Sequence, residues 1–146
     1  MPSSMAFADD GESRSEWPMF GQNLQNTASN AGRKISTSNV AMLAPKWVAP
    51  TGSDVSARAA VVDGVVYFPD WGGNVWALDA KTGARIWQHK LSDYGLPAGT
   101  ISRTSPAVQD NTVYIGTGKG AYLLAIDAKT GDRRWKTQLG AIAECW

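Results

Sequence analysis

Hydrophobic residues occur along this chain in short runs that turn-forming residues interrupt. Over residues 59–87 the runs read "AAVV", "VVYF", "VWAL" and "ARIW", with "DG", "DWGGN" and "DAKTG" between them. Valine, isoleucine and aromatic residues favour strands, whereas Asp-Gly and Gly-Gly pairs favour tight turns. The pattern therefore predicts four short strands joined by hairpins.

The same pattern occurs a second time. "ALDAKTGARIW" begins at Ala77 and "AIDAKTGDRRW" begins at Ala125, 48 residues later, and the similarity extends over 60–87 and 107–135. A repeat of about 40 to 50 residues that contains four strands is typical of β-propeller blades. The sequence predicts an all-β fold with about two blades of four antiparallel strands, plus one extra strand upstream.

Each copy of the repeated motif covers the expected turn between the third and fourth strands of a blade. The aspartate and threonine of the motif can bind the turn backbone, and its glycine can adopt a positive φ. The tryptophan that ends the motif offers a flat ring to a neighbouring blade. We therefore expect a blade-docking set made of Trp47, Ala77, Asp79, Thr82, Gly83, Trp87, Ala125, Asp127, Thr130, Gly131 and Trp135.

The chain divides into four parts by these criteria. They are a disordered segment or signal-peptide remnant at 1–16, a polar lead-in at 17–42, the blades at 43–139 and a tail at 140–146. Inside the blade region we expect a strand at 43–50, a blade at 55–90 and a blade at 102–138.

Two blades do not close a ring, because propellers need at least about four. Repeat proteins also bury their faces only against neighbouring repeats. We therefore expect an incomplete propeller, the N-terminal fragment of a larger protein. Its open blade edges would allow self-association, and it would be inactive in isolation.

The composition excludes several classes of function. The formal net charge is +1, 18% of the residues are charged, and the one dense basic cluster (Arg133, Arg134 and Lys136) falls on an expected edge strand, where cations discourage aggregation. Nucleic acid is therefore not an expected partner. No apolar run approaches the roughly 18 residues of a transmembrane segment. A single cysteine, Cys145, excludes an internal disulfide and a cysteine-rich zinc site.

Three further features have two interpretations each. His89 is the only histidine and reads as a solvated strand residue rather than as a base or metal ligand. "GTGKG" at 116–120 reads as a hairpin turn rather than a phosphate loop, because no helix signal follows it. Ala6-Phe7-Ala8 is either the end of a signal peptide or a chance match to a small-x-small cleavage site.

The residues also carry a family resemblance. The repeated motif AxDxxTGxxxW resembles the tryptophan-docking motif of propellers that bind pyrroloquinoline quinone (PQQ). The lead-in "WPMFGQNLQNTASN", followed by "ISTSNVAMLAPKW", is similar to the N-terminal segment of quinoprotein alcohol dehydrogenases. The stretch from "SARAAVV" to "ISRTSPAV" looks most like the polyvinyl-alcohol dehydrogenase branch, and the resemblance covers about residues 16–139.

The resemblance implies an enzyme that oxidises an alcohol to a carbonyl. PQQ would lie over the propeller axis with a calcium ion beside it, and an aspartate of a later blade would take the hydroxyl proton. The substrate would be a small-molecule or polymeric alcohol, the electron acceptor a cytochrome-type protein, and the location the periplasm. No catalytic residue and no metal ligand is assigned to this chain.

Two arginines are the candidate cofactor-binding residues. The resemblance implies that Arg103, in "ISRTSPAV", pairs with PQQ, whose three carboxylates suit a guanidinium group. Ser56 stands where relatives often have glutamate, and nearby Arg58 is a second candidate partner. Both arginines have the alternative of an ordinary rim role. Trp71 has the alternatives of blade packing and ligand contact.

A second function class stays open at this point. Envelope-assembly propellers share the docking repeat without a cofactor and act as scaffolds of the outer membrane. A scaffold lipoprotein would need a cysteine near its start, whereas the only cysteine here is Cys145. The lead-in segment and Arg103 favour the enzyme. The vicinal Cys-Cys pair that some relatives place against the quinone is absent, since "LPAGTI" stands in that region.

Overall fold

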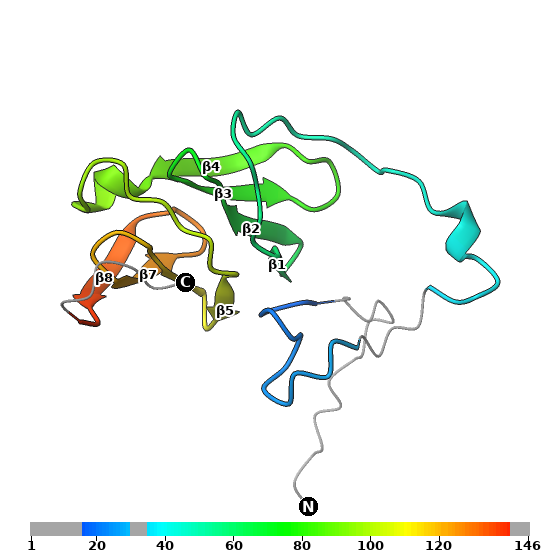
Figure 1. The fold of residues 1–146 in the computed structure, drawn as a ribbon. Helices are drawn as coiled ribbons and strands as arrows, with labels where there is room; N and C mark the ends of the chain where they lie inside the picture. The colour runs from blue at the N-terminus through cyan, green and yellow to red at the C-terminus, as the bar shows by residue number, and fades with distance from the viewer. Residues whose placement is uncertain (1–15, 30–34, 141–146) are drawn as a thin grey trace, which may run out of the picture.

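The computed structural model describes residues 16–29 and 35–140, which form two four-stranded antiparallel sheets lying side by side (Figure 1). Both sheets are simple meanders, with strand orders β1-β2-β3-β4 and β5-β6-β7-β8. The strands are β1 (Ala60–Val62), β2 (Val65–Pro69), β3 (Asn74–Asp79), β4 (Arg85–Lys90), β5 (Ala107–Gln109), β6 (Thr112–Gly116), β7 (Tyr122–Asp127) and β8 (Arg133–Gln138). The predicted all-β fold with four antiparallel strands per blade is confirmed.

The tight turns explain why the hairpins form where the sequence places them. Asp63 and Gly64, between β1 and β2, have φ values of 50° and 75°, and Asp110 and Asn111 occupy the same place in the second sheet with φ values of 49° and 56°. Two successive residues with positive φ match the right-handed twist of paired strands. Asp, Asn and Gly tolerate this conformation better than other residues do.

The main core lies between the two sheets. Buried residues of the first sheet, Tyr67, Val75, Ala77 and Trp87, form one hydrophobic cluster with residues of the second sheet that include Val113, Ile115, Leu124 and Ile126. A smaller cluster on the opposite face of the first sheet contains Phe68, Trp76 and Leu78. The first sheet is therefore apolar on both faces, as expected for a blade with a neighbour on each side.

The lead-in contacts the first strand of each sheet, β1 and β5. Trp17 and Val61 exchange both backbone hydrogen bonds at 2.8 Å, and the Val108 amide donates to the Pro18 carbonyl at 2.8 Å. In Figure 1 this lead-in runs below β1 and beside β5. It thus occupies part of the free edge of β1, which would otherwise expose unpaired backbone groups.

The strand expected at 43–50 does not form. The described part of the chain has a short 3-10 helix, η1 (Val40–Met42), followed by residues that belong to neither sheet. A strand needs a ladder of backbone partners, and none of the eight described strands pairs with this segment. Trp47 nevertheless packs against the smaller cluster of the first sheet.

Several sequence features lie outside the described residues. These are Ala6-Phe7-Ala8, most of the expected segment 1–16, and the tail including Cys145. Within the described residues, no helix has the length and apolar character needed to cross a membrane.

Candidate functional site

The repeated motif forms a compact turn in both sheets. In the first, Asp79 Oδ1 accepts hydrogen bonds from the backbone of Lys81 at 3.0 Å and from the backbone and hydroxyl of Thr82, both at 2.7 Å. These hydrogen bonds from Thr82, together with that from Lys81, lower the pKa of Asp79. The Gly83 amide closes the turn on the Asp79 carbonyl at 2.8 Å.

The second turn has the same backbone hydrogen bonds and two additional side-chain partners, Arg134 and, at 3.5 Å, Asn111 Nδ2. Asp127 Oδ1 accepts from the amides of Lys129 at 2.9 Å and Thr130 at 3.1 Å. Its Oδ2 forms an ion pair with Arg134 at 2.8 Å. The Arg134 hydrogen bond is the largest cause that lowers the pKa of Asp127 to about 2, and the Thr130 amide is the next.

Two tryptophans dock on these turns in the same way. Trp47 Nε1 donates to the Ala80 carbonyl at 3.0 Å, and Trp87 Nε1 donates to the Ala128 carbonyl at 2.9 Å. A Cβ atom on Gly83 would lie 2.7 Å from the Trp47 ring. On Gly131 it would lie 2.8 Å from the Trp87 ring. Glycine is thus required at both places by close packing as well as by its positive φ.

Two further aromatic residues of the first sheet and its extension bind the second turn. The Tyr94 hydroxyl, in the 3-10 helix η2 (Leu91–Tyr94), donates to the Gly131 carbonyl at 2.7 Å. Burial raises the pKa of Tyr94, and Asp132 and Asp93 contribute to the rise. His89 is half buried between the rings of Trp87 and Tyr94, with Nε2 3.4 Å from the Thr130 carbonyl oxygen. His89 thus lies on a strand, as expected, and the neighbouring turn covers part of its ring.

The residues predicted to bind the cofactor lie at the other end of the strands. Arg103 precedes β5, and its guanidinium carbon lies 3.9 Å from the centroid of the Trp71 ring. Trp71 comes from the turn between β2 and β3, and its Nε1 donates to Ser56 Oγ at 2.9 Å. Arg103, Trp71 and Ser56 thus form one contact group, which we call the Arg103 cluster.

A buried carboxylate holds the turn that carries Trp71. Asp70 is fully buried, and its carboxylate accepts hydrogen bonds from the Asn74 amide at 2.9 Å, from Asn74 Nδ2 at 2.9 Å and 3.0 Å, and from Trp76 Nε1 at 2.8 Å. The Trp71 amide also donates to the Asp54 carbonyl at 2.9 Å. A buried carboxylate with several donors gives a rigid turn. Sequence analysis missed Asp70, whose signal is the Asp-x-x-x-Asn spacing in "DWGGN".

The backbone on each side of Arg103 is held to the end of β6. Ser102 Oγ donates to the Gly116 carbonyl at 2.7 Å, and Thr104 Oγ1 donates to the same carbonyl at 3.1 Å. The Gly116 amide in turn donates to Thr104 Oγ1 at 2.9 Å. Arg103 is therefore an exposed side chain on a well-anchored segment.

Arg58 lies in a separate contact group. Its guanidinium carbon is 4.4 Å from the centroid of the Phe20 ring, and its backbone amide donates to Ser105 Oγ at 3.0 Å. Both arginines are exposed, and each is stacked on an aromatic ring. Such stacking orients a guanidinium group and restricts its movement.

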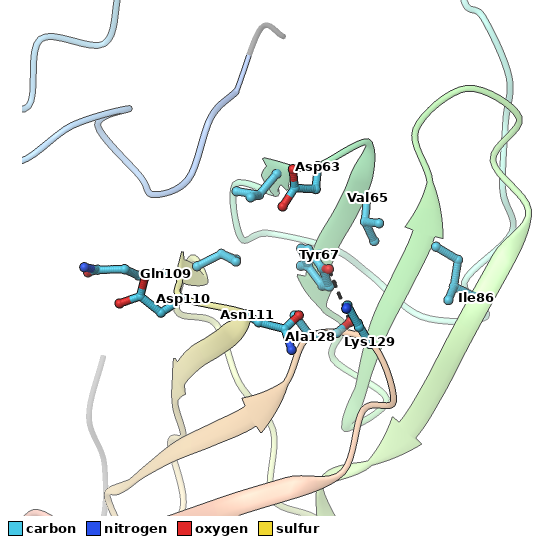
Figure 2. A pocket seen from close by; sticks show the side chains of 11 residues that line it. Asp63, Val65, Tyr67, Ile86, Gln109, Asp110, Asn111, Ala128 and Lys129 are labelled. Carbon is cyan, nitrogen blue, oxygen red and sulfur yellow. Dashed lines mark hydrogen bonds between the residues drawn. The ribbon is translucent and has the colours of Figure 1, made fainter. Parts of the chain in front are cut away.

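Two hollows accompany these features. One of about 410 Å³ borders Trp71, Gly73, Lys90 and Thr100 beside the Arg103 cluster. The other, of about 500 Å³, lies at the opposite end of the sheets, where Asp63, Asp110 and Lys129 line it (Figure 2). Neither Arg103 nor Arg58 lines either hollow, and the second hollow is a gap between the turns of the two blades.

The chemistry of the site fits part of the implied cofactor. PQQ carries carboxylates, and the exposed guanidinium groups of Arg103 and Arg58 suit such groups. The described residues contain no group of three or more His, Cys, Asp or Glu side chains that could hold a metal ion. The two exposed guanidinium groups therefore have the charge and the donors that suit the carboxylates of PQQ.

Comparison with known proteins identifies the family. The PQQ_2 family, described as outer membrane protein assembly factor BamB, matches residues 20–144. The quinoprotein alcohol dehydrogenase PedE of Pseudomonas putida is 34% identical over 90 residues, which are 58% of this chain and 14% of that protein. The chain spans 14–19% of the length of the curated relatives it matches first.

Solved structures agree on the fold. BamB from Moraxella catarrhalis superposes with a TM-score of 0.54 at 21% identity, covering 63% of this chain and 27% of that one. The quinohemoprotein alcohol dehydrogenase from Comamonas testosteroni gives a TM-score of 0.51 at 22% identity, covering 84% of this chain and 27% of that one. The chain therefore belongs to the PQQ_2 family, and its relatives include quinoprotein alcohol dehydrogenases.

Proposed function

We propose that this chain provides the cofactor-binding end of two blades in a PQQ-dependent alcohol dehydrogenase, and that Arg103 binds a carboxylate of PQQ. The observation that carries the proposal is the position of the Arg103 guanidinium, 3.9 Å above the Trp71 ring on a segment anchored at Gly116. A guanidinium group that is already oriented loses little freedom when it binds a carboxylate.

The neighbouring residues have positioning and charge roles in this proposal. Trp71 orients Arg103 from below, and Ser56 holds the indole of Trp71 through its hydroxyl. Arg58 adds a second positive charge just before the first strand, β1. When bound, PQQ accepts two electrons from the alcohol. This chain binds and orients the cofactor, and none of its residues is assigned as the general base.

The finer parts of the proposal concern the whole protein. We propose polyvinyl alcohol or another secondary alcohol as substrate, a cytochrome-type protein as electron acceptor, and the periplasm as location. The resemblance of residues 56–108 to the polyvinyl-alcohol dehydrogenase branch supports the substrate. Relatives named quinoprotein alcohol dehydrogenase and 1-butanol dehydrogenase (quinone) support alcohol oxidation in general.

A non-catalytic envelope scaffold is the second candidate function. The description of the matched family as an outer membrane protein assembly factor favours it. A scaffold would bind proteins through its blades and would have no use for the Arg103 cluster. Cofactor binding therefore separates the two candidates.

Isothermal titration of the full chain with PQQ tests the proposal without any measurement of activity. We expect binding by the wild-type chain and a loss of about tenfold or more in affinity for Arg103→Ala, because hydrogen bonds to charged groups contribute about 1.5–3 kcal/mol. Arg58→Ala should weaken binding less. Arg85→Ala is the matched control, since Arg85 is exposed on β4 and contacts Gln88.

Two results would overturn the proposal. One is a chain with native β-sheet circular dichroism that does not bind PQQ, which would favour the scaffold. The other is an unchanged affinity for Arg103→Ala, which would make Arg103 an ordinary rim residue.

A further inference from the structure

The outer face of the second sheet repeats the aromatic pair that joins the two sheets. The rings of Tyr67 and Trp87 have centroids 6.0 Å apart at an angle of 43°, and both are buried between the sheets. The rings of Tyr114 and Trp135 have centroids 6.1 Å apart at an angle of 51°. Trp135, however, is 43% exposed, against 7% for Trp87.

Strand register shows that the two faces are equivalent. Tyr67 pairs with Ala77 and Ala77 with Trp87, whereas Tyr114 pairs with Ala125 and Ala125 with Trp135. We call Tyr114, Leu123, Ala125 and Trp135 the donor face. Because the Tyr114 and Trp135 rings already have the geometry of the buried pair, this face needs no rearrangement to bind a similar partner.

The buried pair defines what a donor face binds. The Tyr67 hydroxyl and Trp87 Nε1 both donate to the Ala128 carbonyl, at 3.2 Å and 2.9 Å, and the Trp87 ring lies on Gly131. The partner must therefore present a free carbonyl at the residue after the turn aspartate and a glycine with positive φ. Within the described residues, neither the Tyr114 hydroxyl nor Trp135 Nε1 has such an acceptor.

The first sheet carries a complementary surface on its outer side. This acceptor face consists of the Ala80 carbonyl and Gly83, beside the buried side chains of Phe68, Trp76 and Leu78. Trp47 covers it, with Nε1 3.0 Å from the Ala80 carbonyl oxygen. The segment that carries Trp47 forms no sheet, and no tyrosine among the described residues shares the Ala80 carbonyl as Tyr67 shares that of Ala128.

We propose that the donor face binds the acceptor face of a second copy of this chain, head to tail, in place of Trp47. The second copy is the partner whose complementary surface is present in this molecule. A sheet with an oriented Tyr–Trp pair offers more contacts than a single indole on an irregular segment. Trp47 holds the acceptor face in the free chain because it is covalently attached, which gives it a high effective concentration.

The contact is heterologous, because different surfaces of the two copies meet. Such contacts build rings when the rotation between copies closes and open chains when it does not. Trp47 therefore acts as an internal competitor that limits assembly. This proposal does not depend on cofactor binding.

Sedimentation velocity of the full chain over a concentration series tests the proposal. We expect Trp47→Ala to associate reversibly at concentrations about tenfold lower or more than the wild-type chain, because an intramolecular competitor has been removed. Adding Trp135→Ala in the same background should restore the wild-type behaviour. Ile86→Ala in the Trp47→Ala background is the matched control, since Ile86 is exposed and apolar but outside both faces, and should change nothing.

The proposal is overturned if Trp47→Ala associates no more than the wild-type chain. It is also overturned if the double variant associates as strongly as Trp47→Ala. Should Trp47→Ala lose its β-sheet circular dichroism, Trp47→Phe replaces it, since phenylalanine keeps the apolar packing and removes the indole N–H. We then expect a smaller change in the same direction, and an unchanged association for Trp47→Phe would refute the competition.

Discussion

Replacing Trp87 with alanine should destabilise the fold far more than the same change at Trp135, although both residues stand at the last position of the repeated motif. Trp87 is 7% exposed and donates a hydrogen bond to the Ala128 carbonyl at 2.9 Å. Trp135 is 43% exposed and has no such partner within the described residues. The two changes remove the same atoms, so their difference measures the docking contact.

The structure gives the size of that difference. The exposed fractions of 7% and 43% differ by 36% of the surface, which is roughly 90 Å² of about 250 Å² and amounts to about 2 kcal/mol. The lost hydrogen bond adds about 1 kcal/mol. We therefore expect the free energy of unfolding to fall about 3 kcal/mol more for Trp87→Ala than for Trp135→Ala.

Urea denaturation, followed by far-ultraviolet circular dichroism at low protein concentration, measures both values. Trp87→Phe separates the two contributions, because it keeps much of the buried area and removes the N–H donor. It should cost about 1–2 kcal/mol, since the Ala128 carbonyl keeps the Tyr67 hydroxyl as donor. Equal losses for Trp87→Ala and Trp135→Ala would refute the idea that docking of Trp87 stabilises the fold.

Two further predictions concern the repeated turn. The folded-state pKa of Asp127 is lowered to about 2 from an ordinary value of 3.8, so the unfolded chain takes up this proton first as the pH falls. The free energy of unfolding should therefore decrease between about pH 4 and pH 2, and Arg134→Ala should flatten this decrease in acid titrations of stability. Gly131→Ala should destabilise the fold more than Gly64→Ala, as measured by urea denaturation. Both glycines have positive φ, but the new methyl group would lie 2.5 Å from the His89 ring in the first case and in open space in the second. Equal losses would mean that backbone strain alone accounts for both.

Those parts of the fold that depend on neighbouring residues were predictable from the sequence. Alternation of β-branched runs with "DG" and "DAKTG" was enough to predict two sheets of four strands, because hairpins form between adjacent segments. The family was predictable for the same reason, since its motif is a local turn with a fixed spacing. The contacts of Asp79 and Thr82 in that turn are likewise local.

Features that depend on distant partners were not predictable. The segment 43–50 has the composition of a strand, but a strand also requires a ladder partner, and a hydrophobic pattern carries no information about whether one exists. The partial burial of His89 depends on the turn at Thr130 and Gly131, and Thr130 is 41 residues further along the chain. Arg133 and Lys136 looked like edge-strand cations, yet they donate to the carbonyls of Tyr94 and Gly95 in the connection between the sheets.

The acceptor face and the Arg103 cluster share one structural element. Trp76 stacks on Phe68 with centroids 6.2 Å apart, within the cluster that Trp47 covers. The same indole donates to the buried carboxylate of Asp70, which holds the turn that places Trp71 beneath Arg103. Because a buried carboxylate is costly when it loses a donor, the position of Trp76 and the shape of that turn are constrained together. The outer face of the first blade and the candidate cofactor site are therefore built on the same hairpin.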